Sequence, residues 1–219
     1  TFEDATRWAG VDRAATGLGV ACLDVDGDGW LDVFVANDGM PNQLWRNQGG
    51  VRFEETALRD GCALDNDGVA KAGMGVAVDD PDGDGDTDLL VCNLEGQSDS
   101  LFENRGGNFA DRIATSNLRA FSRSFTRFGV AWQDFDADGL LDLYVANGRV
   151  MRLHPALAAD PYAEPNLLLR GVPGGRYEEV LPRGGTDTPL IATSPAAAFG
   201  VVEGDGAVGV LGVDRARPA

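Results

Sequence analysis

Aspartates recur at a fixed spacing in three short stretches of this chain, residues 24–32, 80–88 and 134–142. In each stretch they occupy positions 1, 3, 5 and 9, with glycine at position 6. Four like charges in nine residues repel one another unless a cation neutralises them. Carboxylate oxygens suit a hard cation. Ca²⁺ takes about 6–8 oxygens at about 2.3–2.6 Å with loose geometry, whereas Mg²⁺ requires a strict octahedron, so the loops favour calcium.

The three loops recur at a nearly constant period, because their first aspartates are 56 and 54 residues apart. A single such loop is compatible with a metal-free acidic turn, but three in register argue against that interpretation. An EF-hand needs a glutamate at position 12 and a flanking helix. Position 12 is valine in all three copies, and the flanking segments resemble strands. We therefore predict about three Ca²⁺ ions bound outside an EF-hand.

Short apolar segments surround each loop. In the first copy, residues 18–23 lead into the loop and residues 31–36, rich in β-branched and aromatic side chains, lead out of it. Residues 43–47 and 52–55 form two further predicted strands, separated by turns. Four strands in about 55 residues match the size of a propeller blade. The same order of segments follows in the second and third copies.

The repeat predicts an all-β fold, a partial β-propeller with about three complete four-stranded blades and partial blades at both ends. The predicted blades are residues 17–72, 73–127 and 128–190, the last with an insertion at 148–165. Residues 1–16 read as the end of a preceding blade, with its last strand at 1–6. Residues 191–219 read as a degenerate partial blade in which Glu203 and Asp205 retain two of the four acids. We expect an open arc, because the fourth unit lacks its third strand. Pairing of residues 2–5 with residues 208–213 would instead indicate a closed ring.

Charge and composition restrict the function. The net charge is −17, and three bound divalent ions would still leave −11, so a nucleic-acid partner is not expected. No apolar run approaches 18 residues, so no membrane span is expected. The cysteines Cys22, Cys62 and Cys92 lie in different contexts within the repeat, which does not indicate a disulfide framework. Arg119, Arg123 and Arg127 form a basic stretch that reads as a solvated face, with contact to an anion as the alternative.

Residues that could perform catalysis are few. His154 is the one histidine, in the proline-containing insertion, and no serine or cysteine stands in a recognisable nucleophile motif. The sequence therefore favours a non-enzymatic protein.

The repeated pattern, from Gly-Val-Ala through the aspartate loop to Asn-Gln-Leu-Trp-Arg-Asn and Phe-Glu-Glu, resembles the FG-GAP/VCBS repeat, the calcium-loop blade of integrin α-like propellers. It is most similar to the cartilage acidic protein/ASPIC–UnbV group of secreted proteins. The resemblance implies a β-propeller, usually of seven blades, with calcium at the blade edges. It implies that the aspartates at positions 1, 3, 5 and 9 are ligands and that each position-7 residue lends its backbone carbonyl. The implied metal residues are Asp24, Asp26, Asp28, Trp30 and Asp32; Asp80, Asp82, Asp84, Asp86 and Asp88; and Asp134, Asp136, Asp138, Leu140 and Asp142.

Two functions are compatible with these observations. The first is a non-enzymatic, calcium-binding module, extracellular or periplasmic, for interaction with a protein or a matrix component. The alternative is a calcium-dependent carbohydrate-active propeller, such as a polysaccharide lyase or a glycan-binding protein. An ordered cluster of tyrosine, arginine and histidine around a central cleft would favour the alternative.

Overall fold

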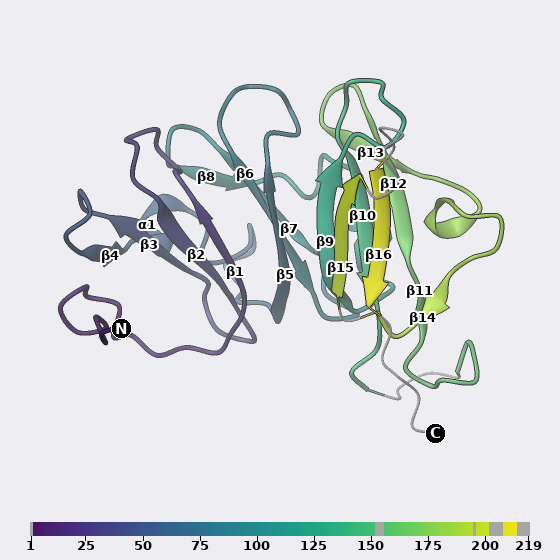
Figure 1. Cartoon of the computed structure of the whole chain (residues 1–219), viewed down its shortest axis with the longest axis horizontal. Helices are drawn as coiled ribbons and strands as arrows, with labels where there is room; N and C mark the ends of the chain where they lie inside the picture. Colours follow the sequence, from purple (N-terminus) through teal and green to yellow (C-terminus); the bar gives the residue numbers. More distant parts are fainter. Residues whose placement is uncertain (1, 152–155, 195, 202–207, 214–219) are drawn as a thin grey trace.

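Three four-stranded antiparallel sheets follow one another along the chain in the computed structural model, which describes residues 2–151, 156–194, 196–201 and 208–213 (Figure 1). Each sheet is a meander in which consecutive strands pair, so the predicted all-β architecture of successive blades is confirmed. The first blade comprises β1 (Gly17–Leu23), β2 (Asp32–Asn37), β3 (Gln43–Asn47) and β4 (Phe53–Glu55). The second comprises β5 (Gly73–Asp79), β6 (Asp88–Asn93), β7 (Ser100–Asn104) and β8 (Phe109–Asp111). The third comprises β9 (Arg127–Gln133), β10 (Asp142–Asn147), β12 (Leu167–Val172) and β13 (Arg176–Glu179).

Shorter elements complete the described residues. The strands β15 (Ala196–Val201) and β16 (Val208–Val213) form a hairpin beside the third blade. Within and after the predicted insertion, β11 (Glu164–Pro165) pairs with β14 (Ile191–Ala192). Three one-turn helices, α1 (Ala57–Asp60), α2 (Leu118–Ser122) and the 3₁₀ helix η1 (Arg183–Gly185), follow the outermost strands. The strand-only pattern did not predict these helices.

The first strands of the blades lie side by side, β1 next to β5, β5 next to β9 and β9 next to β15 (Figure 1). A repeated glycine allows this close approach. A Cβ atom on Gly19 would lie 2.2 Å from the Met74 carbonyl oxygen, and one on Gly75 would lie 1.8 Å from that of Phe128. A Cβ atom on Gly129 would lie 2.5 Å from the Ala197 backbone nitrogen of β15. The glycine five residues before each loop is therefore explained by packing between blades.

The core consists of two apolar layers, one on each face of the second blade. The strand β6 is buried throughout and alternates between them. Leu89 and Val91 pack with the first blade, whereas Leu90 and Cys92 pack with the third. Because side chains of a strand alternate between its two faces, a strand covered on both faces is apolar at consecutive positions.

The predicted strand at residues 1–6 is wrong for the described residues 2–6. These residues form no strand, and a turn follows in which the Asp4 carboxylate accepts the Thr6 N–H at 2.9 Å. The Ala9 carbonyl then accepts the Phe53 N–H at 2.7 Å, so this segment joins the outer edge of the first blade. Phe2 is fully exposed and has no apolar surface against which a strand could pack.

The described residues form an open arc, as predicted. The strand β16 pairs with β15 alone, residues 2–5 join no sheet, and the amino-terminal end lies on the side of the arc away from this hairpin (Figure 1). Two other sequence expectations fall on residues outside the described ranges: His154, and the acids Glu203 and Asp205 of the degenerate loop.

Two further expectations can be compared with the structure. The three cysteines are unpaired, with Cys62 and Cys92 buried and Cys22 exposed. For Arg127 the solvated-face interpretation is wrong, and the alternative, contact with an anionic group, applies to that residue. Its guanidinium is buried and its Nε lies 3.0 Å from Asp99 Oδ1, so it forms an ion pair that links the third blade to the second. Among the described helices, none is long and apolar enough to span a membrane.

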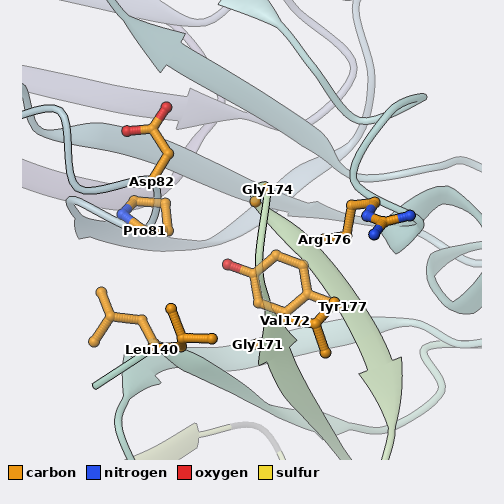
Figure 2. Close-up of a pocket in the computed structure, with 10 residues that line it drawn as sticks. Pro81, Asp82, Leu140, Gly171, Val172, Gly174, Arg176 and Tyr177 are labelled. Carbon is orange, nitrogen blue, oxygen red and sulfur yellow. The ribbon is translucent and has the colours of Figure 1, made fainter. Parts of the chain in front are cut away.

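A cavity of about 300 Å³ lies where the second loop approaches the third blade (Figure 2). Pro81 and Asp82 line one side, and the turn between β12 and β13 lines another. Tyr177 also borders the cavity, but its hydroxyl accepts a hydrogen bond from Trp132 Nε1 at 2.8 Å, and burial raises the pKa of its phenol. Arg176 is exposed at the rim. Tyr177 and Arg176 thus lie together beside the second aspartate loop. The buried, hydrogen-bonded Tyr177 phenol is poorly suited to proton transfer.

Candidate metal sites

Each aspartate loop connects the first and second strands of its blade and is built in the same way. The carboxylate at position 1 accepts backbone N–H groups from inside the loop. Asp24 accepts from Gly27 at 2.9 Å and from Gly29 at 2.8 Å. In the second loop Asp80 accepts from Gly83 and Gly85, and in the third Asp134 accepts from Asp138 and Gly139. These bonds shape the loop around its own first side chain.

The loops turn through left-handed backbone conformations. The glycines at position 6 have φ values of +87° at Gly29, +95° at Gly85 and +88° at Gly139, a region that strains residues with a Cβ atom. Position 4 is also left-handed, and there the third loop carries Ala137 at +59°. The glycine at position 6 in all three copies is therefore required by backbone geometry, as the sequence predicted.

The aspartate at position 9 is the buried member of each loop. Asp32, Asp88 and Asp142 are each at most 3% exposed. Each accepts the backbone N–H of a third-strand residue through Oδ1, at 2.7 Å from Asn47, 2.7 Å from Asn104 and 2.8 Å from Gly171. Burial raises the pKa of all three carboxyls, that of Asp88 to about 7. A bound cation would offset the cost of keeping these carboxylates ionised.

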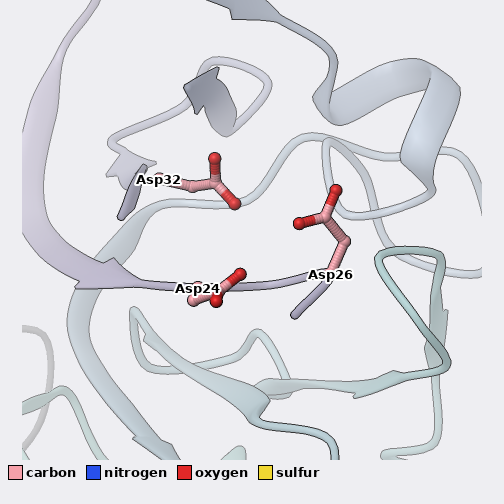
Figure 3. A group of neighbouring side chains, drawn as sticks. All are labelled: Asp24, Asp26 and Asp32. Atoms are coloured by element: carbon pink, nitrogen blue, oxygen red, sulfur yellow. The ribbon is translucent and has the colours of Figure 1, made fainter. Parts of the chain in front are cut away.

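The structure brings three carboxylates together in each loop. One oxygen from each of Asp24, Asp26 and Asp32 lies within 4.8 Å of the others (Figure 3), and the third loop gathers Asp134, Asp136 and Asp142 in the same way. The second loop gathers Asp80, Asp82 and Asp84. These all-oxygen groups have the donor chemistry that Ca²⁺ prefers, so the residues present fit the ion.

The remaining predicted ligands lie outside these groups. They are Asp28, Asp88 and Asp138, together with the position-7 residues Trp30, Asp86 and Leu140. The position-5 carboxylate accepts the N–H of position 7 at 2.9 Å in all three loops, which orders the backbone there. The Asp86 carboxylate accepts the Gly106 N–H at 2.8 Å and so is directed to the turn between β7 and β8.

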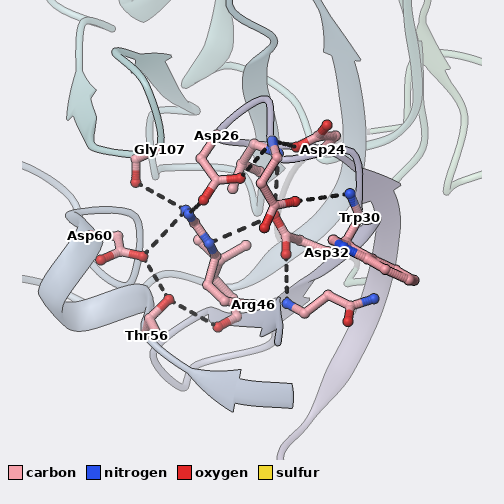
Figure 4. A network of polar contacts seen from close by, with 12 residues as sticks. Asp24, Asp26, Trp30, Asp32, Arg46, Thr56, Asp60 and Gly107 are labelled. Carbon is pink, nitrogen blue, oxygen red and sulfur yellow. Dashed lines mark hydrogen bonds and ion pairs between the residues drawn. The ribbon is translucent and has the colours of Figure 1, made fainter. Parts of the chain in front are cut away.

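Two arginines that the motif analysis did not single out reach the loops from the third strands. Arg46 forms an ion pair with Asp26, and its Nη1 lies 3.4 Å from the Gly107 carbonyl oxygen of the second blade and 3.7 Å from Asp60 Oδ2 (Figure 4). In the third blade, Arg170 Nε lies 3.0 Å from Asp136 Oδ2. The recurrence of arginine in the third strand was a usable signal, because that strand borders the loop.

Successive blades with an acidic loop between the first and second strands define an FG-GAP-like repeat protein. The model of the FG-GAP-like repeat matches residues 24–91 and 80–145, which together make up more than half of the chain. The chain therefore belongs to this family.

Similarity to named proteins is more distant. Cartilage acidic protein 1 of Xenopus tropicalis is 28% identical over 163 residues, 71% of this chain and 24% of that protein. Cartilage acidic protein 1 of Mus musculus is 29% identical over 146 residues, 67% of this chain and 22% of that protein. The chain thus spans about a quarter of the length of these relatives.

Proposed function

We propose that this chain is a calcium-binding, non-enzymatic β-propeller module that acts outside the cell in recognition of a protein or matrix partner. The observation that carries the calcium assignment is the threefold repetition of one loop geometry, with clustered carboxylates and a buried position-9 aspartate in each copy. In all three loops the N–H groups of positions 5 and 6 donate to the position-1 carboxylate and that of position 7 donates to the position-5 carboxylate, which would not be expected of chance acidic turns.

In the first and third loops the ion would be held by the position-1, position-3 and position-9 carboxylates, and in the second loop by those of positions 1, 3 and 5. The remaining carboxylate and the position-7 carbonyl would complete each site. Bound calcium would neutralise the loop carboxylates. The position-9 aspartate also accepts a hydrogen bond from the third strand, so an ion held by it would link the loop to the middle of the blade. Neighbouring blades would benefit too, since Asn104 Nδ2 donates to the Val25 carbonyl of the first loop at 2.9 Å.

The location and partner class follow from affinity and charge. Extracellular calcium modules bind at about 0.1–1 mM, concentrations that the cytosol does not reach. With three ions the net charge would be −11, and this field would repel polyanions. A protein partner with a basic surface is therefore favoured over an acidic glycan. The similarity to cartilage acidic protein 1 supports an extracellular matrix setting.

Calorimetric titration of the calcium-free chain tests the calcium assignment. We expect about three ions per chain, and about two for the double variant Asp24→Asn/Asp26→Asn. Calcium at 100 times its dissociation constant should stabilise the fold by about 2.7 kcal/mol per site. A stoichiometry of zero or one, or a melting temperature that chelator leaves unchanged, would contradict the proposal.

A further inference from the structure

The three loops differ in the charge of one third-strand neighbour. Strand register identifies the equivalent positions, because Trp45, Phe102 and Leu169 pair with the same residue of the second strand in their respective blades. The next residue along each third strand is Arg46 in the first blade, Glu103 in the second and Arg170 in the third. The motif is therefore constant within the loop and variable beside it.

In the first blade the arginine is a fixed positive charge against the loop. The Arg46 side chain is only 14% exposed and pairs with Asp26, while Nε lies 3.7 Å from Asp32 Oδ2. It also reaches Asp60 and the Gly107 carbonyl, which hold it in place (Figure 4). Arg170 in the third blade also pairs with its loop, but its side chain is 53% exposed, so solvent screens its charge more strongly.

In the second blade the equivalent side chain is acidic. Glu103 is held by Arg105 Nη2 at 2.5 Å and by Arg112 Nε at 3.0 Å. Across the described residues, no aspartate of the second loop forms an ion pair with a basic side chain. A cavity of about 90 Å³ adjoins this loop and offers room for the hydration waters of a cation. Its charged lining residues are Asp82, Asp88 and Glu103, together with Arg112, which is paired with Glu103.

We propose that the third-strand residue sets the calcium affinity of each loop, so that the second loop binds most tightly and the first least tightly. The inference rests on the proposed calcium function. A unit positive charge roughly 6 Å from a divalent ion weakens binding about tenfold even at the dielectric constant of water. Arg46 would also partly neutralise the calcium-free first loop, which makes the blades unequal in their dependence on the ion.

The test is a calorimetric titration of the chelator-treated full chain with Ca²⁺ alone. We expect one site about tenfold tighter than the others. Glu103→Gln should weaken that site about tenfold, and Arg46→Gln should tighten one of the weaker sites by a similar factor. The control variants Glu3→Gln and Arg119→Gln make the same charge changes at exposed positions outside the loops and should leave all sites unchanged.

Thermal melts of the same variants provide a second measurement. In chelator, Arg46→Gln should melt at a lower temperature than the parent chain, and its calcium-dependent gain should be larger. If Arg46→Gln does not fold, Glu103→Gln alone decides the question. Three sites of equal affinity, unmoved by Glu103→Gln, would overturn this inference and leave the calcium function intact. If the chain shows no binding heat and its melting temperature does not depend on calcium, both this inference and the calcium function are overturned.

Discussion

The first and second blades have the same repeat pattern but different surroundings. Val20 of β1 is 65% exposed, whereas its equivalent in β5, Val76, packs against the core layer between the two blades. In the second strands, Val35 is half-buried and its equivalent Val91 is 1% exposed. The second blade is covered on both faces and the first on one. Equal sequence therefore does not mean equal stability, because much of the stabilisation lies in the contact between blades.

The largest expected effect comes from obstructing a contact between first strands. Gly75→Ala would place a Cβ atom 1.8 Å from the Phe128 carbonyl oxygen, which belongs to backbone and cannot move aside cheaply. We expect a loss of about 3 kcal/mol in the free energy of unfolding, measured by denaturant titration in saturating calcium.

The matched control for Gly75→Ala is Val20→Ala, which lies on the exposed face of the corresponding strand. Surface changes of this kind usually stay within about 0.5 kcal/mol. A similar loss for both variants would show that the strands themselves, rather than the contacts between blades, limit stability.

The same valine-to-alanine substitution, made at equivalent positions of the first and second blades, measures how much more stability the packing of the second blade contributes. Val91→Ala removes two methyl groups from a fully buried position in the layer between the first and second blades. We expect it to cost about 2 kcal/mol, because the transfer free energy is lost and a cavity remains. Val35→Ala removes the same atoms from a half-buried position and should cost about 1 kcal/mol or less. Urea unfolding of the two variants compares them directly.

The comparison would fail if both valine variants lost the same stability. That outcome would mean that the half-buried face of the first blade is covered in solution by another surface. Sedimentation measurements on the same samples would then show whether a second copy of the chain provides it.

The sequence was sufficient for the features that repeat. The glycines before each loop, the aspartate spacing and the alternation of four strands all recur, and a constraint that recurs three times is visible without a structure. Features that occur once were not predicted. Residues 2–6 alternate only weakly and have no partner surface, and the Arg127–Asp99 ion pair joins residues from two blades.

The candidate sites show the same division. The clustering of position-1 and position-3 carboxylates was predictable from loop spacing alone, and the structure confirms that these side chains come together in all three loops. Whether the third carboxylate comes from position 9 or position 5 differs between loops, and the spacing does not predict this difference. The ion pairs of Arg46 and Arg170 depend on strand register, which the sequence does not give directly.

The smallest expected effect concerns protonation in the second loop. In calcium-free protein the pKa of Asp88 is raised to about 7, mainly because the carboxyl is buried. In the unfolded chain its pKa is about 3.9. Between these values the native state holds a proton that the unfolded state has lost, so stability must fall as the pH rises from 5 to 7. We expect a loss of about 1–2 kcal/mol over this window in chelator, measured by thermal melts across the pH series.

Two variants compare the second loop with the first. Asp88→Asn cannot lose a proton and should remove most of this pH dependence. Asp32→Asn should remove less, because Arg46 lies near Asp32 and opposes the effect of burial on its pKa. In saturating calcium, stability should instead rise with pH, since the ion binds the ionised carboxylate and is displaced by acid. If the two variants change the pH dependence of stability equally, then Glu103 beside the second loop and Arg46 beside the first do not make the two blades different.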